Sequence, residues 1–209
     1  MKKYQFYGWE QADVPATSKT YEKIKNPKEL YDILSEIWCA DTCAPRMRER
    51  WSKENQTLGQ CSITAFLAQD IFGGKVYGIL RPGGNYHCYN VVGDCCFDLT
   101  SEQFGDEILD YRENPEQFRE VHFQKEEKRQ RYEYLKKELE TAKSGSESLL
   151  SIAQKAGLEV KEASDISFNS FQIPGAGIEP RVIGAASISE QGKISEPIEG
   201  NQGVFLIMV

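Results

Sequence analysis

The sequence contains no apolar run long enough to span a membrane, and its first residues, from Met1 to Gln5, lead into no signal-peptide core. It also lacks an excess of positive charge, because 25 Lys and Arg stand against 32 Asp and Glu, for a net charge of −7. That balance argues against bulk binding to nucleic acid. We therefore expect a cytoplasmic protein with neither nucleic-acid nor membrane partners, whose oligomeric state the sequence leaves open.

The paired C-x₂–₄-C pattern of structural zinc sites is also missing. Cys39 and Cys43 are separated by three residues, but Cys95 and Cys96 are adjacent. Adjacent residues on a strand point to opposite faces, so these two thiols do not form a second ligand pair. In a cytoplasmic protein the six thiols should be reduced. We expect no metal and no other cofactor.

The last third of the chain lacks four residue types altogether. All six Cys, both His, all three Trp and all ten Tyr precede residue 135. The stretch Lys143-Ser144-Gly145-Ser146 follows this shift and has the composition of a short flexible linker. We predict two units, 1–143 and 144–209.

The first unit does contain an ordered trio, Cys61, His87 and Asp98. A thiol, an imidazole and a carboxylate are the parts of an activated cysteine nucleophile. Each residue type alone is more often structural, since most Cys are small buried hydrophobes and a lone His usually packs or faces solvent. The local sequence around each member therefore decides how much weight the trio carries.

Cys61 is predicted to lie in the first turn of a helix. The apolar residues that follow it are spaced as on one face of a helix: Ile63, Phe66, Leu67 and Ile71. Gly73-Gly74 ends the pattern. The free N–H groups and the dipole at a helix start favour thiolate over thiol, and they can also hold an oxyanion. Gln60 or Asn55 could add a side-chain donor to such an oxyanion site.

His87 and Asp98 are predicted to lie on two paired strands. Tyr86–Val92 and Cys95–Leu99 flank the turn signal Gly93-Asp94. With a two-residue turn, Val92 faces Cys95 and Tyr89 faces Asp98. Because side chains alternate, His87 and Asp98 then share a face, and an error of one residue would separate them.

Other segments of the first unit complete an α+β fold. Asn26-Pro27-Lys28-Glu29 begins a helix, Lys75–Leu80 forms a strand, and Gln124 to Ala142 forms a charged helix. Its basic stretch, Lys125–Arg131, is interleaved with Glu and indicates a solvated face. A helix that carries the nucleophile, followed by antiparallel strands with His and acid, is the layout of papain-like cysteine enzymes.

Residues 31–143 also resemble the bacterial YunG-like family of small proteins. The resemblance implies a papain- or transglutaminase-like core but no substrate. Where members of that family often have His-Tyr-Trp-Asn, this chain has His87-Cys88-Tyr89-Asn90, which keeps His87 and Asn90. The matching segments are Thr42–Pro45, Trp51-Ser52, Asn55–Ala65, Gln69–Gly74, His87–Asn90 and Phe97–Phe104.

The second unit has weaker signals. We expect helices over 148–156 and 181–188, a strand over 158–160, turns over 173–180 and a buried strand over 203–209. Gly192–Ile198 and Gly203–Val209 resemble the end of Bacteroides-type parvulin peptidyl-prolyl isomerases and chaperones of the SurA and PpiD kind. The first strand and the site histidines of parvulins are absent, so no isomerase activity is expected, and we interpret the chain as a fusion.

The sequence thus predicts a cysteine hydrolase or acyl transferase that acts on a peptide or small amide. Two alternatives remain open: a non-catalytic binding or regulatory protein that keeps the fold, and a peptide-binding, chaperone-like module in the second unit. His122 has no acid hairpin beside it, so it is not chosen as the base. Cys96 should share the face of His87 and could be a second reactive thiol, although packing is the simpler role.

Overall fold

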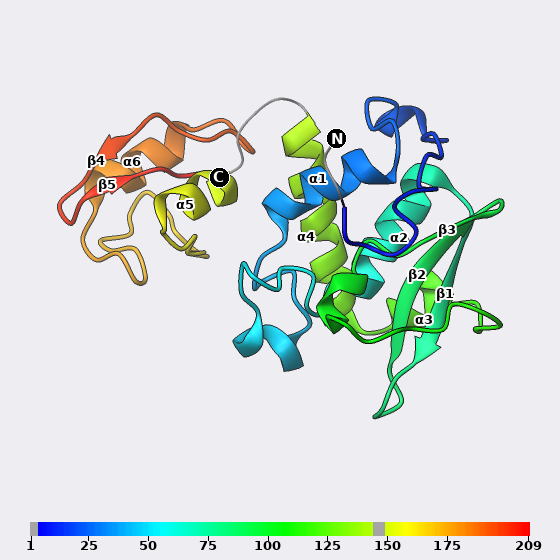
Figure 1. Cartoon of the computed structure of the whole chain (residues 1–209). Coiled ribbons are helices and arrows are strands. Elements are labelled where there is room, and N and C mark those ends of the chain that lie inside the picture. Colours follow the sequence, from blue (N-terminus) through cyan, green and yellow to red (C-terminus); the bar gives the residue numbers. More distant parts are fainter. Residues whose placement is uncertain (1–3, 144–148) are drawn as a thin grey trace. The chain divides into compact units, whose positions relative to one another are not determined.

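The computed structural model describes residues 4–143 and 149–209. The chain divides into two compact units, Met1–Ser144 and Gly145–Val209 (Figure 1). Helices and strands are mixed in both units, which confirms an α+β class. The elements of the first unit are η1 (Lys19–Tyr21), α1 (Pro27–Ile37), η2 (Pro45–Arg50), α2 (Cys61–Phe72), β1 (Lys75–Leu80), β2 (Tyr86–Val92), β3 (Cys95–Phe97), η3 (Ser101–Phe104), α3 (Arg119–His122) and α4 (Glu126–Lys143).

Helix α1 begins where the sequence predicts it. The Asn26 side chain accepts a hydrogen bond from the backbone N–H of Glu29 at 3.1 Å, and Pro27 occupies the first helical position. The Glu29 carboxylate in turn accepts from the backbone N–H of Lys25 at 2.9 Å. These bonds satisfy N–H groups that a helix start leaves unpaired.

The predicted hairpin and its register are confirmed as far as Phe97, but the expected pairing of Tyr89 with Asp98 is not formed. Strands β1, β2 and β3 form an antiparallel sheet in that order, and Val92 pairs with Cys95 around a two-residue turn. Strand β3 ends at Phe97, two residues earlier than expected. Asp98 leaves β2 and donates its backbone N–H to the carbonyl of Tyr7 at 3.0 Å, so a segment from the N-terminus continues the edge.

Helix α2 packs on β1 and β2, and α4 packs against α1 and α2, an arrangement that Figure 1 shows around the sheet. Asn90 on β2 links the sheet to α2 by a hydrogen bond, in which its side-chain amide donates to the carbonyl of Ala65 at 2.8 Å. The core between these layers contains Trp38, Phe66, Phe72, Phe97 and Leu135. This packing sets the start of α2 beside His87 and Cys88, near the beginning of β2.

The second unit contains α5 (Leu149–Ala156), α6 (Pro180–Ile188), β4 (Ile198–Glu199) and β5 (Val204–Phe205). Both predicted helices are confirmed, except that residue 148 lies outside the described residues. The strand predicted over 158–160 is wrong, because these residues are exposed and pair with no other strand in the described part of the chain. The strand predicted over 203–209 shrinks to Val204–Phe205, and Val204 is 71% exposed rather than buried.

Candidate active site

Cys61 is the first residue of α2. Its position is set by two loops that pack together, one at Thr42-Cys43 and the other at Gly59. Gly59 adopts a φ of +69°, and a Cβ there would lie 2.8 Å from the Cys43 sulfur. Arg131 is buried and donates to the carbonyls of Thr42 and Gly59, both at 2.9 Å. The start of α2 is therefore held by close packing and by hydrogen bonds to a buried guanidinium.

His87 and Asp98 form a buried pair. Nε2 of His87 lies 2.5 Å from Oδ2 of Asp98, and the two residues are 2% and 1% exposed. The other contacts of the carboxylate are all donors: the N–H and hydroxyl of Thr100, at 3.0 and 3.1 Å, and the hydroxyl of Tyr111, at 3.0 Å. These donors hold the carboxylate of Asp98 oriented toward the imidazole.

The second ring nitrogen of His87 is available to the thiol. Nδ1 is buried and has no hydrogen-bond partner within residues 4–143 and 149–209. Phe104 packs edge-on to the ring, with 4.6 Å between the ring centres, and restrains its orientation. Cys61 and His87 interact electrostatically, and because Asp98 occupies Nε2, Nδ1 is the ring nitrogen left for the thiol.

The environment favours a thiolate and an imidazolium. Burial raises the pKa of Cys61, but its interaction with the imidazole of His87 and a hydrogen bond from the backbone of Cys88 bring it down to about 7. Burial lowers the pKa of His87, but the charge and hydrogen bond of Asp98 and the contact with Cys61 raise it to about 10. Between these two values both groups are charged and stabilise each other.

The other five cysteines have the opposite property. Burial disfavours the thiolate and is the main reason why the pKa of each of these thiols is raised. The five residues are Cys39, Cys43, Cys88, Cys95 and Cys96. All six thiols are free. Cys61 is thus the single cysteine whose surroundings favour the nucleophilic form.

The structure does not bring Gln60 and Asn55 to the thiol. Gln60 is fully buried, and its amide donates to the carbonyl of Cys39 at 3.1 Å. Asn55 lies in the loop before α2, where its backbone forms a tight turn with Ser52. Neither residue lines the cleft at Cys61. The backbone N–H groups in the first turn of α2 are the donors that lie beside the thiol.

A cleft of about 580 Å³ opens at Cys61 and His87. Its walls come from η2, the turn after β1, η3 and the start of α4. Tyr111 and Phe104 contact the triad but follow no sequence periodicity, so sequence reasoning missed both. The sequence around Gln103 and Phe104 indicates an ordered segment, but it does not indicate that Phe104 packs against His87.

His122 also lines the cleft, although no role was predicted for it. Its Nε2 lies 3.0 Å from Oε1 of Gln117, and its Nδ1 lies 3.0 Å from Nζ of Lys128. Burial and the charges of Lys128 and Lys125 lower the pKa of His122 to about 4. His122 is therefore neutral at physiological pH, with Nε2–H as donor to Gln117 and Nδ1 as acceptor from Lys128.

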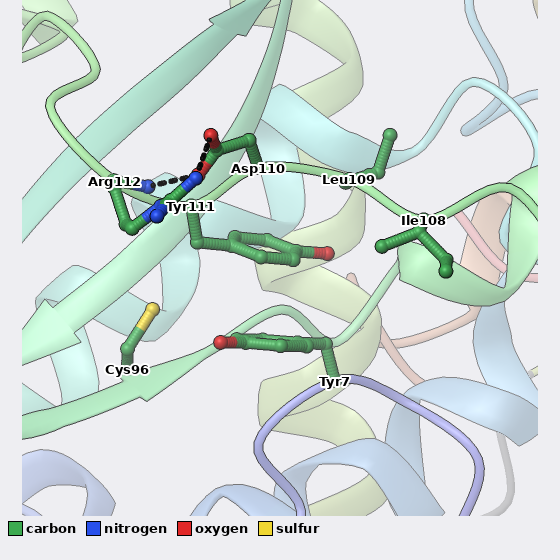
Figure 2. Close-up of a pocket in the computed structure, with 7 residues that line it drawn as sticks. All are labelled: Tyr7, Cys96, Ile108, Leu109, Asp110, Tyr111 and Arg112. Carbon is green, nitrogen blue, oxygen red and sulfur yellow. Dashed lines mark hydrogen bonds and ion pairs between the residues drawn. The ribbon is translucent and has the colours of Figure 1, made fainter.

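Cys96 lines a second, shallower cavity of about 620 Å³. Figure 2 shows the stacked rings of Tyr7 and Tyr111 beside it, with 3.7 Å between the ring centres and an angle of 13°. Burial, followed by the charges of Asp98 and Cys95, raises the pKa of Cys96 to about 11. This environment disfavours a second reactive thiol and fits the packing role.

Residues 4–143 and 149–209 contain neither a cluster of metal ligands nor a membrane-spanning helix. No group of three or more His, Cys, Asp or Glu side chains there is arranged to hold a metal ion. No helix in those ranges combines the length and the apolar character that crossing a membrane requires.

Comparison with known proteins identifies relatives of the first unit. A family model described as "YunG protein" matches residues 26–144. "Uncharacterized protein YunG" of Bacillus subtilis (strain 168) is 35% identical over 72 residues, which are 34% of this chain and 57% of that protein. No solved structure matches the chain. The YunG-like resemblance is thereby confirmed, whereas the parvulin resemblance of the second unit stays a prediction.

Proposed function

The chain belongs to the YunG protein family, and from the site in its first unit we propose that it is a cysteine hydrolase or acyl transferase. In this proposal Cys61 is the nucleophile, His87 is the acid and base, and Asp98 orients the imidazole. The observation that carries the proposal is the lowered pKa of Cys61, about 7, beside a buried His87–Asp98 pair. A cysteine with only a packing role needs neither partner.

The chemistry follows from the charges of the pair. The Cys61 thiolate attacks the carbonyl carbon of an amide, and N–H groups at the start of α2 stabilise the oxyanion. The imidazolium of His87 gives its Nδ1 proton to the departing amine, which leaves a thioester on Cys61. Water or a second nucleophile then gives a proton to His87 and attacks the thioester. Release of the acyl group restores the thiolate.

A papain-like core is part of the proposal. In chain order the nucleophile begins a helix, the base lies on an antiparallel strand, and the acid follows the next strand. Helix α2 packs on the strand that carries His87, as such a core requires. Peptide and small amide bonds are the substrates that this chemistry suits best.

The test is alkylation of each cysteine as a function of pH, with peptide mass spectrometry as the readout. Cys61 should react with iodoacetamide with a midpoint near pH 7, well below the ordinary thiol pKa of about 8.5. In His87→Ala the midpoint should rise above that ordinary value, because burial then acts without the imidazolium. Cys95, which is partly exposed, is the control within the same molecule.

A Cys61 that reacts no faster than Cys95 at pH 7, or that is unchanged by His87→Ala, would contradict the proposal. The non-catalytic binding protein would then be the better interpretation. If Cys61 is activated as expected, amide substrates can be screened with Cys61→Ser as the inactive control, since serine keeps the shape but lacks a stable anion near pH 7.

A further inference from the structure

The cleft at Cys61 carries a charge opposite to that of the whole protein. The chain has a net charge of −7, yet apart from the Cys61–His87 pair, whose charges cancel, the ionised side chains on the cleft wall are five cations and one carboxylate. These are Arg46, Arg81, Lys125, Lys128, Arg131 and Glu127. A cleft with walls of one sign concentrates ligands of the other sign.

Two of the five cations have structural partners. Arg131 pairs with Glu127 at 3.2 Å in addition to its bonds to the loop carbonyls. Arg81 contacts both carboxylate oxygens of Glu107 at 2.8 Å and lies over the ring of Phe104. These contacts account for Arg81 and Arg131 without any ligand.

The other three cations, Arg46, Lys125 and Lys128, make no ion pair with any carboxylate in the described ranges. Arg46 extends from η2 and the two lysines come from the start of α4, so the cations stand on different walls of the cleft. The sequence predicted that Lys125–Arg131 is a solvated helix face. Lys128 and Arg131 depart from that expectation, because one is half-buried and the other is buried.

Lys128 is the most informative of the three. Its ammonium group donates to the neutral imidazole of His122, which Gln117 holds in place from the other side. The cation is therefore positioned by a group that does not cancel its charge. It also interacts electrostatically with Cys61. A half-buried ammonium group is costly unless a counter-charge reaches it, and the cleft is the side from which one can come.

We propose that Arg46, Lys125 and Lys128 bind a carboxylate of the substrate, so that the cleft accepts amides with a negative charge close to the reacting carbonyl, as in acidic peptides. This inference rests on the proposed function, because it assumes that the substrate reacts at Cys61. The cations would orient the acyl group and raise the local concentration of anionic substrates.

The test uses two reagents that differ only in charge. N-iodoacetyl-glutamate α-amide and N-iodoacetyl-glutamine α-amide carry the same electrophile, and each forms a C–S bond to Cys61 with loss of iodide. We measure the rate of the glutamate reagent divided by the rate of the glutamine reagent, for Cys61 and for free glutathione. At low salt this ratio should be about threefold or more higher for Cys61 than for glutathione, and the difference should shrink at high salt.

The variants Lys125→Gln and Lys128→Gln should each reduce this preference, as should Arg46→Gln. Lys137→Gln removes the same charge from an exposed position of α4 outside the cleft, so it should leave the preference unchanged. Arg46 and Lys125 are exposed, so their variants keep the test valid if Lys128→Gln disturbs folding.

The outcomes separate the two proposals. Equal rates for the two reagents at a Cys61 that reacts with a midpoint near pH 7 would overturn the anionic-substrate inference and leave the proposed function standing. A preference that falls equally in Lys137→Gln would also overturn it, since net charge alone would be the cause. A Cys61 that reacts with neither reagent faster than Cys95 would overturn both.

Discussion

Among single residues, Asp98 has the largest effect on the charge of the site, because its carboxylate contacts the imidazole at 2.5 Å. In Asp98→Asn the imidazolium loses its counter-charge, so the pKa of His87 should fall well below about 10. A less charged imidazole stabilises the thiolate less, and the pKa of Cys61 should rise. Nitrogen NMR of the two histidine rings measures the first effect directly.

His122 is the control in the same spectrum. Its pKa is lowered to about 4 by burial and by the neighbouring lysines, and Asp98 does not contribute. Its titration should stay unchanged in Asp98→Asn. A His87 that titrates at the same pH in the variant would show that Asp98 does not stabilise the imidazolium.

Tyr111 supports the same carboxylate through a hydrogen bond of 3.0 Å. Tyr111→Phe keeps the ring that stacks on Tyr7 but removes this donor. Loss of a hydrogen bond to a buried charged group should lower the free energy of unfolding by about 1.5–3 kcal/mol, measured by urea denaturation. Tyr77→Phe is the matched control, since its ring stacks on Tyr89 and no described hydrogen bond involves its hydroxyl. Equal losses in both variants would refute the role of the Tyr111 hydroxyl.

The proximity of Cys61, His87 and Asp98 could be predicted from sequence, because Cys61 and His87 lie in periodic segments and Asp98 directly follows one. The helical spacing after Cys61 and the alternation around Gly93-Asp94 determine which side chains share a face. Tyr111 and Phe104 lie in non-periodic segments, and their contacts depend on the path of the chain in three dimensions. For the same reason the sequence could not show that Gln60 points into the core.

At the scale of elements, the position of α2 depends on the turn at Gly59. Gly59→Ala should lower the free energy of unfolding by about 2 kcal/mol or more, because it adds a contact of 2.8 Å with Cys43 to a left-handed backbone conformation. Urea denaturation measures the loss. Alkylation of Cys61 should also slow, since the start of α2 must shift to accommodate the methyl group.

Gly105→Ala separates the two causes. Gly105 has a φ of +59°, close to that of Gly59, but a Cβ there would meet nothing within 4 Å. This variant should lower the free energy of unfolding only by the backbone strain, about 1–3 kcal/mol, and by less than Gly59→Ala does. If both variants lower the free energy of unfolding by the same amount, close packing against Cys43 is not the reason why position 59 requires glycine.

Sequence patterns predicted the elements of the first unit better than those of the second. Helix α1, α2 and the hairpin have caps, stops and a buried face that all agree. In the second unit the strand expected over 158–160 has apolar residues but finds no partner strand among the residues that the structure describes, and Leu158 is 68% exposed. A β-strand needs a neighbour for its backbone hydrogen bonds, and a short sequence window does not contain that information.

For the whole molecule, the two units differ in how far they can be connected to function. The family match covers residues 26–144, and every residue of the triad and of its cleft lies in the first unit. The hydrogen bonds that hold Asp98, His87 and the start of α2 also come from this unit. Removal of residues 145–209 should therefore leave the site intact.

A chain that ends at residue 144 should unfold cooperatively in urea and keep the alkylation midpoint of Cys61 near pH 7, with the full chain as the control. Buried groups of the second unit make their own bonds: the Glu179 carboxylate accepts from the backbone N–H groups of Asn201 and Gln202 at 2.6 and 2.7 Å. If the shortened chain does not fold, the division into two units is wrong. If it folds but the midpoint rises toward 8.5, the second unit contributes to the electrostatics of the site, and activity has to be sought in the full chain.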